Sequence, residues 1–305
     1  MLEILGKTNI DFMGKRRWAF IFSGMMAVLG IVAMVQIARG AANLGIDFAG
    51  GTAVQLKFDQ TIRIDEARKA LAANGLGDAE LQEFGQDNKL LIRLKATTTI
   101  EEKIADRVVA VFTKEFSSNR FVVDSSTEIG PTIGQKLQED ALIAIVISFV
   151  GIILYVAARF EFRFGIAAAL ATFHDVLAVL GAFYILDKEI TLLVVTALLT
   201  LAGYSMTDTV VVFDRIRENL RMRRRESEET IINQAVNQVL SRTIVTSLTV
   251  VLVLIPLTVA GGEVLHDFSL ALLWGVIFGT YSSVFVASPL LLVWPGGSGR
   301  LLKRS

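Results

Sequence analysis

The chain has 305 residues, of which 53% are hydrophobic before glycine is counted, whereas soluble domains reach roughly 45–50% with glycine included. The 30 basic and 30 acidic residues cancel, and nothing in their distribution indicates nucleic-acid binding. The absence of cysteine excludes disulfides, thiol catalysis and thiolate metal sites. Only His174 and His266 could supply imidazole ligands. No cofactor is therefore expected, although carboxylates could still bind a hard cation.

The apolar residues are concentrated in six long runs. Residues 18–37 contain no charge, and about twenty residues at ~1.5 Å each cross a hydrocarbon core of about 30 Å. A basic flank at 15–17 is typical of a signal peptide, but the apolar run exceeds the usual ~7–15 residues, so we predict an uncleaved first span. Five further spans are predicted at about 141–158, 165–186, 190–213, 240–260 and 268–294.

Basic residues of the tails and short loops alternate cleanly between the two sides of these spans. One side collects the Lys and Arg residues of 1–17, 159–163, 215–225 and 300–305, while the opposite short loops contain only Lys188. Lys and Arg stay preferentially in the cytoplasm. We therefore expect a multi-pass membrane protein with cytoplasmic tails (1–17, 300–305), a cytoplasmic loop (214–239), an external segment (38–137) and a five-helix bundle (138–299).

The external segment is long enough to form a domain. Its pattern predicts strands at 52–58, 79–84, 89–95 and 120–125, and helices at 65–75 and about 99–116. Thr98 and Glu101 have the spacing of a capping box. The order βαββαβ is that of a ferredoxin-like α+β domain. No nucleophile, acid–base pair or ligand cluster stands out, which favours a binding or lever module.

A glycine motif, Gly45-Ile-Asp-Phe-Ala-Gly-Gly-Thr52, lies at the start of this domain. Its three glycines, Gly45, Gly50 and Gly51, permit tight backbone geometry. It is not a phosphate-binding P-loop, because the Gly-Lys-Ser/Thr ending is missing and a strand follows where a P-loop precedes a helix. The residues alone predict a turn that leads into the strand at Thr52, with Asp47 capping backbone amides.

Asp208 lies inside an apolar run, about six residues before Asp214 and so roughly 9 Å from that boundary. An ionised carboxylate there costs ~2.5–3.5 kcal/mol on insertion scales, which favours protonation or a partner cation. Arg242 is a candidate partner, because successive spans run in opposite directions. The alternative is that Asp208 hydrogen-bonds a serine or threonine while Arg242 extends to the cytoplasmic surface.

His174 and Asp175 lie near the middle of the third span. Adjacent helix residues point ~100° apart, so we expect that they do not both face one narrow site. Each has either an intramembrane function or a structural hydrogen bond between helices. Small residues at four-residue spacing (Gly275, Gly279, Ser283) suit close helix approach, either within the chain or against a partner.

These segments resemble the SecD and SecF protein-export family. The glycine motif looks like the family's own. The fourth and fifth spans of SecF-type members are similar to two segments of this chain, Leu201-Ala-Gly-Tyr-Ser-Met-Thr-Asp-Thr-Val-Val-Val-Phe-Asp-Arg-Ile-Arg-Glu-Asn219 and Leu240-Ser-Arg-Thr-Ile-Val-Thr-Ser247. His174-Asp175 and Glu128-Ile-Gly-Pro-Thr-Ile-Gly134 extend the match in the correct order. SecD-type members have an Ala-Val-Asp-Ala-Asn form in the fourth span and a longer external region, so the resemblance is to the SecF type.

The resemblance implies a non-enzymatic subunit of the Sec translocase in the cell inner membrane. With SecD it would use the proton-motive force to promote late translocation and release of exported polypeptides, and positions matching Asp208 and Arg242 are implicated in proton passage. Further implied partners are the SecY-SecE-SecG channel, YajC, YidC and membrane lipids. Two alternatives stay open: half of a small-molecule or lipid exporter of the resistance-nodulation-division superfamily, or a passive scaffold. The coupling ion would be a proton or sodium.

Overall fold

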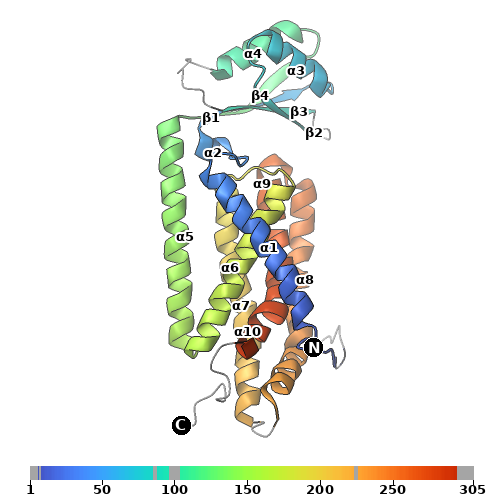
Figure 1. Cartoon of the computed structure of the whole chain (residues 1–305). Coiled ribbons are helices and arrows are strands. Elements are labelled where there is room, and N and C mark those ends of the chain that lie inside the picture. The colour runs from blue at the N-terminus through green and yellow to red at the C-terminus, as the bar shows by residue number, and fades with distance from the viewer. Residues whose placement is uncertain (1–5, 7, 85–87, 96–103, 223–225, 294–305) are drawn as a thin grey trace. The chain divides into compact units, whose positions relative to one another are not determined.

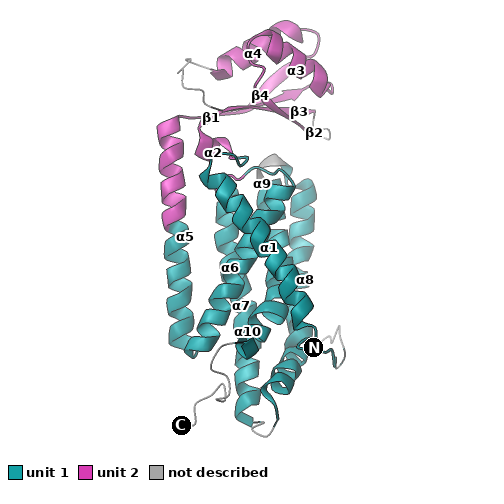
Figure 2. Ribbon diagram, in the orientation of Figure 1, with its two compact units in different colours: residues 1–43, 144–189, 193–305 teal, residues 44–143, 190–192 magenta. Residues whose placement is uncertain are grey.

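The structure is a computed structural model that describes residues 6, 8–84, 88–95, 104–222 and 226–293 (Figure 1). It divides into two compact units (Figure 2). Unit 1 comprises residues 1–43, 144–189 and 193–305, and unit 2 comprises residues 44–143 together with the short segment 190–192. The expected capping box at Thr98 and Glu101 lies outside the described residues.

Unit 2 contains a four-stranded antiparallel sheet in the order β2-β3-β1-β4. Its elements are, along the chain, α2 (Ile46–Ala49), β1 (Gly51–Phe58), α3 (Ile64–Ala73), β2 (Glu80–Phe84), β3 (Lys89–Lys95), α4 (Ile104–Glu115) and β4 (Phe121–Ile129). The four strands and two longer helices are found where the pattern placed them, and β3 has its expected bounds. β4 is longer than expected because it pairs along the whole of β1, with a register shift at Gln55/Leu56.

The core of unit 2 is built by alternating residues of β1 and by the apolar faces of α3 and α4. Val54, Leu56 and Phe58 are buried, as the two-residue period of a strand requires when one face is covered. Phe112 of α4 is fully buried, and its ring centroid lies 5.8 Å from that of Phe58 and 6.4 Å from that of Phe121. The sheet and the helices therefore share one aromatic centre.

The six predicted spans are confirmed as helices long and apolar enough to cross a membrane. They are α1 (Arg16–Ala38), α5 (Pro131–Arg159), α6 (Phe162–Ile185), α7 (Leu192–Met222), α8 (Glu228–Ala260), and a sixth formed by α9 (Gly262–Ser282), the π-helical segment η1 (Ser283–Ala287) and α10 (Ser288–Val293). The Ser288 hydroxyl donates to the Ser283 carbonyl at 2.8 Å within the π-helical stretch. Such π-helical interruptions occur frequently at functional sites.

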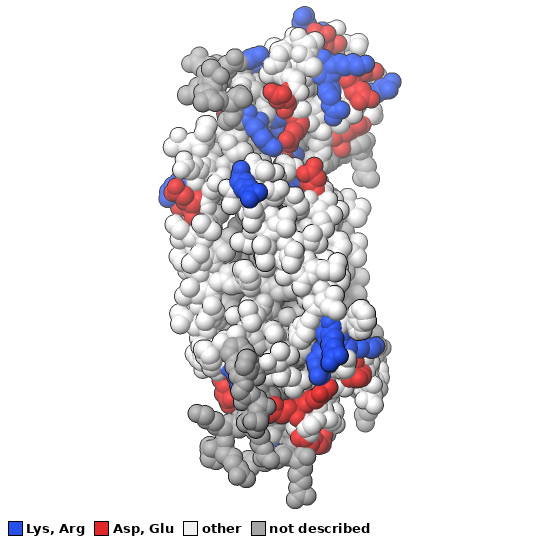
Figure 3. Space-filling model, in the orientation of Figure 1, with Lys and Arg blue, Asp and Glu red and all other residues white. Residues whose placement is uncertain are grey.

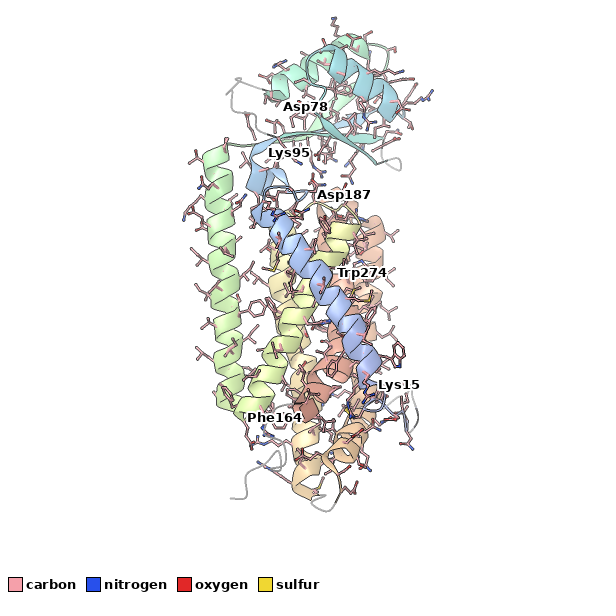
Figure 4. The ribbon with its side chains drawn as sticks, viewed as in Figure 1. Lys15, Asp78, Lys95, Phe164, Asp187 and Trp274 are labelled. Atoms are coloured by element: carbon pink, nitrogen blue, oxygen red, sulfur yellow. The ribbon has the colours of Figure 1, made fainter. Side chains whose placement is uncertain are left out.

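The helices of unit 1 divide into inner and outer ones. The apolar window of α6 is 67% buried, whereas that of α5 is only 6% buried, so α6 forms the interior and α5 presents most of its surface outward. Lys15 and Phe164 lie at one end of the bundle and Asp187 at the other (Figure 4). On the face drawn in Figure 3, the helices between these ends carry almost no charge, as a membrane-spanning bundle requires.

The expected loop at 214–239 is largely helical, which corrects the sequence-based boundary. α7 continues through the charged residues 214–221 and ends at Met222, and α8 begins at Glu228, well before the apolar run. Ile216 and Ile232 are buried, and the Arg215 Nε–H donates to Gln238 Oε1 at 2.6 Å. The many basic residues nearby made these apolar positions hard to recognise in the sequence. Their burial stabilises both helices beyond the apolar spans.

The close crossing of α1 and α6 generates a test of packing. A Cβ on Gly30 would overlap the backbone of Leu177, whereas nothing lies within 4 Å of the corresponding position on Gly24. Gly30→Val should therefore lower stability by about 1–3 kcal/mol through overpacking, and Gly24→Val should not. Thermal unfolding of the detergent-solubilised protein measures the difference. Equal melting temperatures for the two variants would contradict this packing.

Candidate functional site

Asp208 lies on α7 with its two carboxylate oxygens in different surroundings. The Thr243 hydroxyl of α8 donates to Oδ1 at 2.8 Å. Oδ2 is buried and has no hydrogen-bond partner among the described residues. A buried carboxylate oxygen without a donor is unfavourable, so this position is suited to take up a proton or a small cation.

Arg242 does not form the expected ion pair with Asp208. It is exposed on α8, and no ion pair joins the two side chains within 4.0 Å in the described structure. Thr243, the next residue along α8, makes the direct contact with Asp208. The contact that Asp208 makes is the alternative considered from the sequence, a hydrogen bond from a threonine hydroxyl.

Asp175 is completely buried on α6, where three spans meet. Its Oδ2 accepts hydrogen bonds from Ser205 of α7 at 2.5 Å and from Ser282 of α9 at 2.8 Å. The two serine hydroxyls and the Asp175 carboxylate therefore connect α6, α7 and the sixth span by hydrogen bonds. An interhelical hydrogen bond, the structural role considered for this residue, is therefore present.

His174 and Asp175 are in contact, so the expectation that they diverge is wrong. His174 Nδ1 lies 3.1 Å from Asp175 Oδ1. Their Cβ atoms leave the helix in different directions, but rotation about the side-chain bonds brings the imidazole back to the carboxylate. His174 Nε2 is buried without a hydrogen-bond partner among the described residues.

The surroundings of the two carboxylates are connected. Ser205 lies on α7 one turn before Asp208, while Ser282 and its neighbour Ser283 lie where α9 passes into η1. Ser283 shares a hydrogen bond of 3.0 Å with Thr209, the residue after Asp208. A network of serine and threonine hydroxyls therefore joins Asp175 to the environment of Asp208.

The small residues of the sixth span pack within the chain. A Cβ on Gly275 would come within 2.6 Å of Leu201, and one on Gly279 within 3.1 Å of Ser205. Both contacts are with α7. Of the two interpretations left open by the sequence, the internal contact is the one observed at these positions, and it brings Ser205 and Ser282 close enough to share Asp175.

The glycine motif forms a short helix in place of the expected simple turn. After α2, Gly50 (φ 71°) and Gly51 (φ 143°) adopt backbone conformations that favour glycine, and β1 begins at Gly51. Thr52 is buried in β1 opposite Leu94 and Glu128. Asp47 Oδ2 accepts a hydrogen bond from the backbone N–H of Leu192 at 2.9 Å. Asp47 therefore does cap a backbone amide, but a distant one.

Comparison with known proteins places this arrangement in a family. The family described as protein export membrane protein SecD/SecF, C-terminal, matches residues 108–296, and the SecD/SecF GG motif matches residues 42–62. The chain belongs to the SecD/SecF family. The resemblance noted in the sequence is thereby confirmed, and the GG motif includes Gly45 and Asp47.

Relatives of the SecF type match the chain over its whole length. A protein translocase subunit SecF from Thermodesulfovibrio yellowstonii is 51% identical over 100% of both chains, and one from Vibrio alginolyticus is 38% identical over 96% of this chain and 92% of its own. The crystal structure of SecDF from Thermus thermophilus, a translocon-associated membrane protein, has a TM-score of 0.83 at 35% identity and covers 94% of this chain. This chain spans 39% of that SecDF chain.

Sequence reasoning found the two carboxylates and the kind of hydrogen bond that each makes, but it did not identify the hydroxyl donors themselves. Ser205, Thr243 and Ser282 are common residue types in helices, and only Ser205 carries a local signal, because it precedes Asp208 by one helical turn. The partner of Asp47 had no local signal at all, since Leu192 lies 145 residues away.

The buried bonds of Asp175 predict the effect of removing one donor. Ser205→Ala should lower the free energy of unfolding by about 1–3 kcal/mol, because a fully buried carboxylate loses a hydrogen bond without gaining water. Thr200→Ala is the matched control, since that hydroxyl donates only to the Thr196 carbonyl of its own helix at 2.9 Å. Thermal or denaturant unfolding in detergent checks the pair. An equal, small loss in both variants would contradict the assigned role of Ser205.

Proposed function

We propose that this chain is an accessory subunit of the Sec translocase that works with SecD and uses the proton-motive force to promote late translocation and release of exported proteins. The observation that carries the proposal is Asp208, a carboxylate inside a span whose Oδ2 is buried and without a donor among the described residues. Membership of the SecD/SecF family supports it, as do relatives named protein translocase subunit SecF. No bond of a substrate is made or broken.

SecD is the expected partner of the exposed polar face formed by α7 and α8. Thr196, Thr200, Gly203 and Thr207 are exposed along α7, and Arg242 is exposed on α8 beside Asp208. Lipid tails solvate a cation poorly, so this face is expected to be covered by protein or to line a hydrated path. The SecDF chain that this protein resembles is more than twice as long, which supports a second set of spans. The SecY-SecE-SecG channel, YajC and YidC complete the proposed assembly.

The orientation follows from the basic residues. With Lys15 and the other basic residues of its end in the cytoplasm, both termini are cytoplasmic and residues 38–137 lie outside the inner membrane. We infer that the sheet of unit 2 is a ferredoxin-like domain, because its strands have the order β2-β3-β1-β4 and two helices follow β1 and β3.

Proton uptake would act on Asp208 through charge. Protonation removes the attraction between the carboxylate and Arg242, and it gives Oδ2 a hydrogen to donate where it now has no partner. The bond from Thr243 and the contacts of Ser283 would then rearrange, allowing α7 and α8 to shift. A membrane potential contributes ~2.3 kcal/mol per charge per 100 mV, which is enough to bias such an equilibrium.

Replacement of Asp208 tests the proposal directly. Membrane vesicles containing the Sec channel, SecD and this chain should complete translocation faster with a proton gradient, and Asp208→Asn should abolish that stimulation because the side chain no longer gains or loses charge. Asp187→Asn makes the same chemical change at an exposed position and should retain it. A sodium gradient in place of the proton gradient separates the two possible coupling ions.

Normal gradient stimulation in an assembled Asp208→Asn variant would overturn the proposal. It would also favour the passive scaffold, which needs no titrating group. Loss of the complex itself would instead show a structural role for the carboxylate, so co-purification with SecD is measured alongside translocation.

Thr243 provides a second test within the same helix. Thr243→Val removes the hydroxyl that donates to Asp208 at 2.8 Å, whereas Thr246→Val removes a hydroxyl that donates to backbone carbonyls of its own helix, at 3.0 Å for Arg242 and 2.9 Å for Thr243. We expect at least a severalfold loss of gradient stimulation for Thr243→Val and little change for Thr246→Val. Equal rates in the two variants would show that Thr243 does not act on Asp208.

A further inference from the structure

The glycine motif is hydrogen-bonded to the segment at the start of the fourth span. Leu44 and Ile190 form a parallel bridge, and the Gly45 N–H donates to the Ile190 carbonyl at 3.1 Å. Two residues further along each segment, the Leu192 N–H donates to Asp47 Oδ2 at 2.9 Å. All of these residues belong to unit 2, which takes only residues 190–192 from this part of the chain.

The contact with Asp47 is made at the first residue of α7. The first amides of an α-helix have no acceptor within the helix, and the helix dipole makes this end favourable for a negative charge. Asp47 therefore stabilises the start of the fourth span from a segment 145 residues away. The bond would be lost if the motif and the start of α7 separated.

The motif is also packed closely on both sides. A Cβ on Gly45 would come within 2.8 Å of the Thr191 side chain, and one on Gly134 within 2.8 Å of the Phe48 carbonyl. The Gln138 Nε2–H of α5 donates to that same Phe48 carbonyl at 3.0 Å. The short helix α2 is thus held against the starts of both α5 and α7.

The same motif continues directly into the centre of the sheet. Gly50 and Gly51 join α2 to β1 without an intervening loop, and β1 pairs with β3 on one side and β4 on the other. Leu192 is therefore linked, through its hydrogen bond with the Asp47 side chain and through the chain from Asp47 to Gly51, to β1, one of the two inner strands of the sheet.

We propose that Asp47 is a coupling residue that keeps the start of α7 and strand β1 moving as one body. The inference deepens the proposed function and rests on it, because Asp208 lies on the same helix, about sixteen residues or ~24 Å beyond Leu192. A shift of α7 caused at Asp208 reaches the external domain through the Asp47–Leu192 bond and the Leu44–Ile190 bridge. Asp47 binds no substrate and acts only through this joint.

Substitution of Asp47 tests the coupling in the vesicle assay described above. Asp47→Ala removes the acceptor and should abolish gradient-stimulated translocation, while Asp47→Asn keeps an oxygen acceptor and should retain a large part of it. Asp59→Ala is the control at an exposed position of the same unit. Uptake of protons, followed with a pH-sensitive dye in the same vesicles, should persist in Asp47→Ala and disappear in Asp208→Asn. Full translocation by Asp47→Ala would overturn the coupling role.

A cross-link separates coupling from simple stabilisation. The chain has no cysteine, so Leu44→Cys with Ile190→Cys introduces a single pair at the bridge, where the strand-like spacing suits a disulfide. Oxidation should leave gradient stimulation unchanged in the otherwise natural chain and should restore it in Asp47→Ala, with reductant reversing the rescue. Failure of the rescue, or a block by oxidation in the natural chain that reductant relieves, would overturn the proposal.

The failure of this inference differs from failure of the proposed function. If Asp208→Asn translocates normally, proton coupling at Asp208 is wrong whatever Asp47 does. If Asp208→Asn loses stimulation but cross-linked Asp47→Ala is not rescued, the proton site stands and the joint is wrong.

Discussion

Buried carboxylates need donors from other helices, and this requirement organises the interior of the bundle. Asp175 has no exposed surface, so its carboxylate accepts hydrogen bonds from hydroxyls of α7 and the sixth span in place of water. Those hydroxyls reach it only because glycines at 275 and 279 let the sixth span approach α7 closely. The hydrogen bonds of Asp175 therefore depend on the small residues, since larger side chains in place of the glycines would separate the donors from the carboxylate.

Asp208 is held less completely than Asp175, and the contrast separates the two roles. Asp175 has partners for both oxygens, as expected for a group that fixes the packing of three helices. Asp208 has one hydroxyl donor and a second oxygen with none among the described residues. A group that must gain and lose a charge is better served by such incomplete solvation, because a fully satisfied carboxylate would be held in one state. The π-helical segment that begins at Ser283 gives the sixth span a local irregularity at the junction between the two sites.

The parts of the structure that depend on local pattern could be predicted from the sequence, and those that depend on distant contacts could not. The six spans follow from the length of their apolar runs, and β1 follows from the alternation of apolar and polar residues along 52–58. The extent of α7 and α8 was missed because buried isoleucines were hidden among basic residues. The positions of Asp208 and Asp175 were identifiable because a charge is conspicuous in an apolar run. The direction of Arg242 and the contact between His174 and Asp175 depend on helix rotation and side-chain torsion, which periodicity does not determine.

The fourth span carries both halves of the proposed mechanism on one continuous helix. Its interior holds Asp208, whereas its first residue is bonded to the GG motif. A helix transmits axial displacement because each turn is hydrogen-bonded to the next, so a small shift at the carboxylate is not dissipated before Leu192. The joint must then be stiff, and the tight contacts around Gly45 and Gly134 meet that need. The glycines of the motif therefore serve close packing at 45 and special backbone conformation at 50 and 51, and Asp47 supplies the polar bond that holds the two segments in register.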